Sequence, residues 1–212
     1  MHRLLMTSEA YQMSSEFDAP QNVATDAGNR YLWRFRQQRL EAEAVRDVVL
    51  NVSGSLNMEM YGQAIFPKIP DEILASMTKG IWNQRDGEEG PDVWRRSVYV
   101  YRKRGLVLPF FEVFDLPDQN LTCGRRNIST VPTQALTLLN NDFIYAHAKR
   151  FAGRVRELSS DKQEQVTLAY ELALSRPPSD EERKLGLKFL ETNSLEDFSN
   201  VLFYLSEFVY IR

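Results

Sequence analysis

The residue types best suited to binding chemistry gather between positions 94 and 104, where the sequence reads WRRSVYVYRKR. Arginine side chains bind carboxylate and phosphate groups through paired hydrogen bonds, and an exposed tyrosine ring can stack on a sugar or a base. A second arginine pair follows about twenty positions later. The candidate binding residues are Trp94, Arg95, Arg96, Tyr99, Tyr101, Arg125 and Arg126.

The same cluster has a structural interpretation. Glu112, Asp115 and Asp118 lie close by in the sequence and would neutralise the arginines in a half-buried network. Charged residues at a sheet edge also oppose aggregation. The sequence favours this internal network over an open anion site, and the contacts of the arginines decide between the two.

Other chemistries have less support. Glu43 and Asp47 share one face of a predicted helix, but Arg39 and Arg46 are spaced to pair with Glu43, which is typical of a solvated helix face. His147 stands without the HxxxH or HExxH spacing of a helix-borne zinc site. One cysteine, Cys123, excludes an internal disulfide and a CxxCH haem attachment. We expect no catalytic residue, no metal ligand and no cofactor, and a hydrolase using Glu43, Asp47, Glu112 or Asp115 is the weakest hypothesis.

Composition narrows the class of protein. The 212 residues have a formal net charge of −3, with 43% hydrophobic and 26% charged residues. These values are ordinary for a globular protein. The negative net charge argues against a nucleic-acid partner, because proteins that bind nucleic acid are usually basic. No apolar run approaches the length of a membrane span, and the first residues do not have the pattern of a signal peptide.

Hydrophobic periodicity and capping residues predict a mainly α fold. We expect an amphipathic helix that begins abruptly at the first residues, a loop over 18–29, and a long helix over 30–53 ended by Gly54. A long irregular insert, 55–93, follows, helical only at 71–78. Alternation of valine and tyrosine predicts a short strand or hairpin at 96–102, and Pro109 begins a short helical turn.

The C-terminal third has the clearest signals. A helix begins at Pro132 and breaks near Asn140–Asn141. Ser160, Ser179 and Ser194 stand three positions before Gln163, Glu182 and Asp197, as in helix N-caps. Helices over 161–175, 180–192 and 195–208 then form a three-helix antiparallel bundle. We divide the chain into an N-terminal helical part, 1–158, truncated at its start, and a bundle, 159–212, packed on it as one continuous domain.

Four segments resemble one known family. They are RLEAEAVRDVVLNVSGSL (39–56), RRSVYVYRKR (95–104), FFEVFDLPD with CGRRNISTVPTQALTLLNNDF (110–143), and LALSRPPSDEE with the terminal LSEFVYIR. In order and spacing they resemble the planctomycete-type domain of unknown function DUF1553, also called PSD1. The resemblance implies the C-terminal portion of a larger exported or cell-envelope bacterial protein, often carrying a cytochrome c-like domain, with upstream domains of the same polypeptide as partners.

Two functions from different classes remain open. The first is a non-catalytic structural or interaction module of that larger protein. The second is a binding domain for anionic polysaccharide or another carbohydrate, or part of a polysaccharide-degrading system, which would use the arginines, the tyrosines, Trp82 and Trp94.

Overall fold

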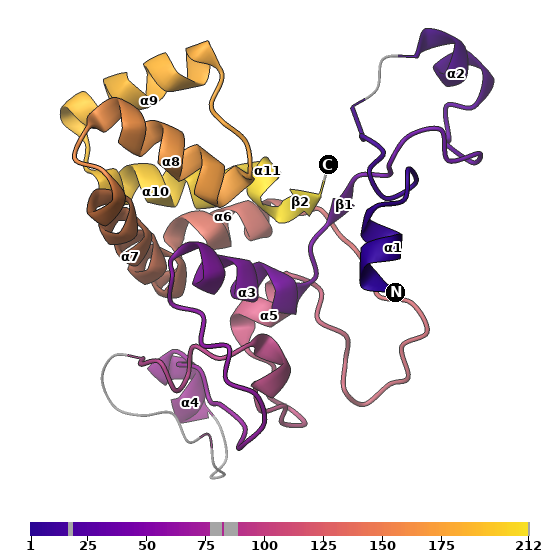
Figure 1. Cartoon of the computed structure of the whole chain (residues 1–212). Coiled ribbons are helices and arrows are strands. Elements are labelled where there is room, and N and C mark those ends of the chain that lie inside the picture. The colour runs from indigo at the N-terminus through magenta and orange to yellow at the C-terminus, as the bar shows by residue number, and fades with distance from the viewer. Residues whose placement is uncertain (17–18, 77–81, 83–88, 212) are drawn as a thin grey trace. The chain divides into compact units, whose positions relative to one another are not determined.

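The computed structural model describes residues 1–16, 19–76, 82 and 89–211 (Figure 1). These residues form two compact units. Unit 1 contains Met1–Leu40 and Val209–Arg212, and unit 2 contains Glu41–Phe208. Helices dominate the described part, where the only sheet is a pair of two-residue strands. The prediction of a mainly α fold is therefore confirmed.

Unit 1 has little regular structure. Its elements are α1 (His2–Met6), α2 (Pro20–Thr25), β1 (Gln38–Arg39) and β2 (Tyr210–Ile211), and the two strands pair antiparallel. The first helix is thus shorter than its apolar pattern suggests. The predicted loop over 18–29 contains α2, which begins at a proline in the first helical position, where proline is favoured.

The prediction of one helix over 30–53 is wrong for its first half. Asn29 and Leu32 have φ of 51° and 55°, a left-handed conformation that cannot continue a right-handed helix. The Asn29 side chain also competes for the backbone, because its Nδ2 donates to Arg34 O and its Oδ1 accepts from Arg34 N. The helix, α3, covers only Ala42–Val52. Gly54 follows it with φ of 74°, as the predicted C-terminal glycine should.

Unit 2 continues from α3 through extended chain and short helices. These are α4 (Asp71–Ser76), the 3-10 helix η1 (Ser97–Tyr99) and α5 (Pro109–Val113). The first and last match the expected helical segments, apart from positions 77 and 78, which lie outside the described residues.

The strand or hairpin expected at 96–102 is replaced by η1 at its centre. Ser97 donates both its backbone N–H, at 2.8 Å, and its hydroxyl, at 2.7 Å, to Asp47 Oδ1 of α3, and this anchor turns the chain. Only isolated bridges flank the turn, Asn57 with Arg95 and Ile65 with Val100. Val98 points to solvent while Val100 is buried, although a strand would place both valines on one face, so the alternation in the sequence does not correspond to burial here.

The second half of unit 2 is a helical core. Its helices are α6 (Pro132–Asn140), α7 (Asp142–Leu158), α8 (Lys162–Leu174), α9 (Asp180–Thr192) and α10 (Leu195–Tyr204). It also contains α11 (Ser206–Val209) except for the last residue, which belongs to unit 1. The break between α6 and α7 is confirmed, since Asn141 caps α7 by accepting from Phe143 N at 3.0 Å. Helices α7 and α10 pack closely, with Phe151 stacked on Phe203 at 5.6 Å between ring centroids. Helices α8, α9 and α10 contact one another as the predicted bundle requires.

Capping explains why these helices begin where they do. Ser179 and Ser194 cap α9 and α10 as expected, and each forms a reciprocal capping box, with Glu182 and with Asp197. The third expectation is wrong by one residue, because Asp161 rather than Ser160 caps α8, accepting from Glu164 N at 2.9 Å.

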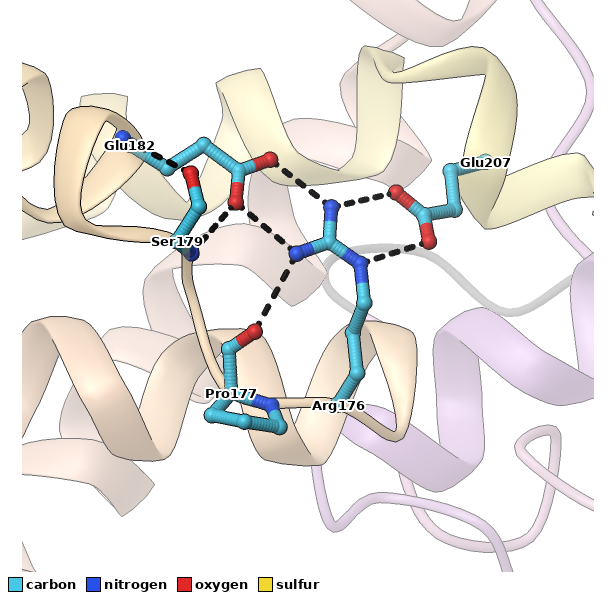
Figure 2. A network of polar contacts seen from close by, with 5 residues as sticks. All are labelled: Arg176, Pro177, Ser179, Glu182 and Glu207. Carbon is cyan, nitrogen blue, oxygen red and sulfur yellow. Dashed lines mark hydrogen bonds and ion pairs between the residues drawn. The ribbon is translucent and has the colours of Figure 1, made fainter.

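One arginine ties the bundle together. Arg176, in the turn between α8 and α9, donates to both oxygens of Glu182 and both oxygens of Glu207 at 2.7–2.8 Å (Figure 2). The hydrogen bonds from Arg176, followed by the capping contact with Ser179, lower the pKa of Glu182 to about 2 against the opposing effect of burial. We call Arg176, Glu182 and Glu207 the Arg176 clamp.

Candidate interaction site

The polar centre of unit 2 is built around Arg46 of α3. Its side chain is 2% exposed, and it donates to Arg95 O at 2.9 Å, to Val93 O at 2.8 Å and to Ser97 Oγ at 3.2 Å. Burial lowers the pKa of Arg46, while the charges of Glu89 and Asp47 oppose that effect. A buried guanidinium is stable only when its donors are satisfied. Here the carbonyls of Val93 and Arg95 and the hydroxyl of Ser97 satisfy them, which holds residues 93–97 against α3.

Arg95 does the same for the segment before it. It is buried, and its guanidinium donates to three carbonyl oxygens, those of Gln63 at 3.0 Å, Glu59 at 3.3 Å and Tyr61. Its other face lies on the ring of Tyr99, 3.9 Å from the ring centroid. We call residues 58–63 the Arg95 loop, because the chain curls around this one side chain.

Neighbouring side chains close the Arg95 loop. Tyr61 N donates to Tyr99 Oη at 2.7 Å, and Arg96 contacts Met60 Sδ at 2.8 Å. The pKa of the Tyr99 hydroxyl is lowered, chiefly by the hydrogen bond from Tyr61 N and also by the charges of Arg96 and Arg95. Tyr61 has φ of 67° and Gly62 has φ of 89°. Tyr61 therefore keeps a left-handed conformation that a bulky side chain rarely adopts.

The Arg95 loop presents apolar side chains outward. Met58 is 61% exposed, Met60 51% and Tyr61 80%, and Val98 of η1 is 74% exposed beside Tyr99. Exposed apolar groups held together by a fixed framework mark protein contact surfaces more often than isolated ones do. We call Met58, Met60, Tyr61 and Val98 the Arg95-loop surface.

Two further arginines form ion pairs at the start of α3. Arg102 donates to Glu43 at 2.6 Å, and Arg126 donates to Glu43 at 2.7 Å and lies 3.2 Å from Glu41. Partial burial acts to raise the pKa of Glu43, but the hydrogen bond from Arg126 and the charges of both arginines outweigh it and lower that pKa. Two distant loops are thereby fastened to one carboxylate.

The partners of the arginines differ from those expected. Asp115 instead accepts from Ser129 N and Ser129 Oγ at 2.8 Å, and Asp118 caps Asn120. Arg46, expected to pair with Glu43 on the helix face, is buried among backbone carbonyls. The internal network exists, but backbone oxygens and Glu43 make it in place of the carboxylates at 112, 115 and 118.

Trp94 and Tyr101 face other parts of unit 2. Trp94 is buried, with the guanidinium of Arg150 4.1 Å from its ring centroid and His147 at its edge. Tyr101 packs against Phe66 at 5.0 Å and Trp82 at 6.4 Å between centroids. Arg125 is exposed, in contrast to Arg126 next to it. The contacts therefore group Arg95, Arg96 and Tyr99 in one place and distribute the other four candidate residues.

Sequence reasoning did not find one buried pair, Ser53 and His147. Ser53 Oγ lies 3.1 Å from His147 Nδ1, and both residues are almost fully buried. Burial, followed by the charges of Arg46 and Arg150, lowers the pKa of His147 to about 3, so the ring is neutral. The nearest sequence signal is the i, i+4 apolar spacing around His147, which places it on the inner face of α7. We interpret the pair as a structural contact because substrate cannot reach it.

Other site types find little support in the described residues. Across 1–16, 19–76, 82 and 89–211, no three histidine, cysteine or acidic side chains gather in a way that could hold a metal ion. Within the same ranges, each helix is too short or too polar to cross a bilayer.

Fold and site together define a helical module whose central arginines bind its own backbone. Residues 1–190 match the family model described as PSD1, Protein of unknown function (DUF1553), and the chain belongs to that family. Searches of curated proteins and of solved structures found no match.

Proposed function

We propose that this chain is a non-catalytic interaction module of a larger exported multi-domain bacterial protein, and that it packs against other domains of the same polypeptide, among them a cytochrome c-like domain. The observation that carries the proposal is the Arg95-loop surface. Buried Arg95 fixes the Arg95 loop through hydrogen bonds to three of its carbonyl groups, and the ring of Tyr99 holds the guanidinium in place. The fixed loop and the neighbouring η1 present four exposed apolar side chains.

The contacts of the polar residues support a binding rather than a catalytic role. Glu43 accepts hydrogen bonds from two arginines, Asp47 accepts them from Ser97, and Asp115 accepts them from Ser129. A carboxylate committed to such bonds is a poor general base, since proton transfer would break them. Rigid presentation favours protein contact, because a surface that is already ordered loses less entropy on binding.

The experiment compares association with the preceding segment of the natural polypeptide. The wild-type chain and a Met58→Ser/Tyr61→Asn variant are each titrated with that segment, and dissociation constants are measured. Asparagine tolerates the left-handed conformation at position 61, so the Arg95 loop should keep its shape. We expect the variant to bind at least about tenfold more weakly, the loss typical of a central contact residue.

The matched control is Leu185→Ser, which removes an exposed apolar side chain of α9 away from the Arg95 loop. It should leave the dissociation constant unchanged. A wild-type chain that does not associate with the preceding segment, or a double variant that binds as well as wild type, would refute the proposal.

The second candidate, binding of acidic carbohydrate, gains little support at Arg95 and Arg126, because contacts within unit 2 occupy their guanidinium groups. The guanidinium of Arg96 contacts Met60 Sδ, a weak acceptor. A different observation favours it, a cavity in unit 1.

A further inference from the structure

A cavity of about 750 Å³ lies within unit 1. Small-molecule sites commonly have volumes of a few hundred to about a thousand Å³. The residues that line it and matter to its chemistry are Glu16, Asn29, Arg34, Phe35, Arg36 and Gln37.

Two arginines of this lining, Arg34 and Arg36, are not paired with acidic side chains of the described residues, unlike Arg102 and Arg126 of unit 2. The contact recorded for the Arg34 side chain is with the ring of Trp33, whose centroid lies 4.9 Å from the guanidinium carbon. Stacking leaves the in-plane N–H donors of a guanidinium available to a ligand.

Hydrogen bonds of the backbone fix the walls of the cavity. Buried Asn29 bonds both the N–H and the carbonyl of Arg34, and Trp33 Nε1 donates to Asp26 O at 3.0 Å. Phe35 N donates to Ser14 O at 3.0 Å, which joins the two sides of the cavity. These bonds fix the backbone that carries Arg34 and precedes Arg36, and Trp33 also contacts the Arg34 side chain. An ordered backbone reduces the entropy lost on binding.

We infer that this cavity binds an acidic oligosaccharide, with its carboxylate or sulfate groups on Arg34 and Arg36. Both anions accept the paired hydrogen bonds that a guanidinium donates. The polar groups of Gln37 and Ser15 offer acceptors and donors to sugar hydroxyls, and the half-buried ring of Phe35 offers an apolar face to a pyranose. An acidic peptide would also bind the arginines, but it has no row of hydroxyl groups to form hydrogen bonds with the polar lining.

The experiment is calorimetric titration of the whole chain with four probes. These are trigalacturonate, a sulfated galactan trisaccharide, a neutral galactose trisaccharide and hexaglutamate. We expect saturable binding of one or both acidic sugars, with the two arms identifying carboxylate or sulfate, and at least about tenfold weaker binding of the neutral sugar and of the peptide.

The variant Arg34→Gln/Arg36→Gln removes both cations and should weaken binding of the acidic sugar at least about tenfold. The control Arg30→Gln/Arg3→Gln makes the same change in charge in unit 1 at exposed positions outside the cavity. It should change binding by less than about twofold in moderate salt, because neither side chain lines the cavity and salt screens exposed charges. A circular dichroism spectrum identical to that of wild type verifies that each variant is folded.

Three results would overturn the inference. These are the absence of saturable binding to either acidic sugar, equal or tighter binding of hexaglutamate, and equal losses in the cavity and control variants. None of them bears on the Arg95-loop surface, whose test uses different residues and a protein ligand.

Discussion

Arg46 and Arg176 both hold distant segments together, but they lie in different surroundings and bind different partners. Arg46 is buried and donates to backbone carbonyls and a serine. Arg176 has a side chain 35% exposed and donates to two carboxylates (Figure 2). A buried charge without partners is far more costly than an exposed one, whereas a solvated ion pair adds little. The first arginine should therefore determine whether its region folds, and the second should adjust stability.

The largest effect is expected from Arg46→Met. Methionine fills part of the volume but leaves the carbonyls of Val93 and Arg95 without their donor, and buried hydrogen bonds to charged groups contribute about 1.5–3 kcal/mol each. We expect the free energy of unfolding to fall by about 3 kcal/mol or more in urea denaturation. A loss below about 1 kcal/mol would show that water replaces these bonds easily.

His147 is buried like Arg46 but carries no charge. Its pKa is about 3 in the folded chain and near 6.5 in the unfolded chain. The unfolded state therefore takes up the proton first, so this contribution to stability is complete above pH 6.5 and declines as the pH falls toward 3. Linkage gives a loss of about 2 kcal/mol between pH 7 and pH 5.

Urea denaturation at a series of pH values measures this loss. His147→Gln cannot titrate, so its stability should change by about 2 kcal/mol less than that of wild type between pH 7 and pH 5. His2→Gln is the control, and its curve should run parallel to that of wild type. Parallel curves for wild type and His147→Gln would contradict a neutral buried ring.

The smallest of these effects is expected at the Arg176 clamp. Arg176→Gln breaks bonds to Glu182 and Glu207, but partial exposure limits the loss to about 1 kcal/mol. Because the pKa of Glu182 is lowered from 4.5 to about 2, its contribution is present above pH 4.5 and is lost as the pH falls toward 2. The difference between variant and wild type should therefore vanish near pH 2, as measured by thermal unfolding. A difference that is constant with pH would assign the effect to packing of the arginine stem.

Local signals in the sequence predicted the helix starts from α5 onward well. Prolines at 109 and 132, Asn141 and the capping serines at 179 and 194 act within four residues, so their consequences can be read without the fold. The errors at 30–41 and 96–102 have another origin. Ser97 turns because Asp47, fifty positions away, accepts its hydrogen bonds, and no periodicity reports such a contact.

The sequence predicted which arginines gather at the candidate site but not which groups they bind. The concentration of arginines at 95–104 and 125–126 is visible in the sequence. Their partners are not, because Glu43 lies 59 positions from Arg102 and 83 from Arg126, and Arg95 binds carbonyl groups, which every residue has. Arg34 and Arg36 lie within the predicted helix over 30–53. Because the chain is not helical there, their place in a cavity could not be predicted from the helix pattern.

The internal role of the arginines at 95–104 and 125–126 is tested most directly by one set of unfolding measurements. Arg95→Gln and Arg126→Gln remove arginines that bond within unit 2, while Arg104→Gln and Arg125→Gln remove exposed arginines from the same segments. We predict that the free energy of unfolding falls by about 2 kcal/mol for Arg95→Gln and about 1 kcal/mol for Arg126→Gln. The exposed pair should stay within about 0.5 kcal/mol of wild type. Equal and small changes for all four variants would contradict an internal role for the arginines.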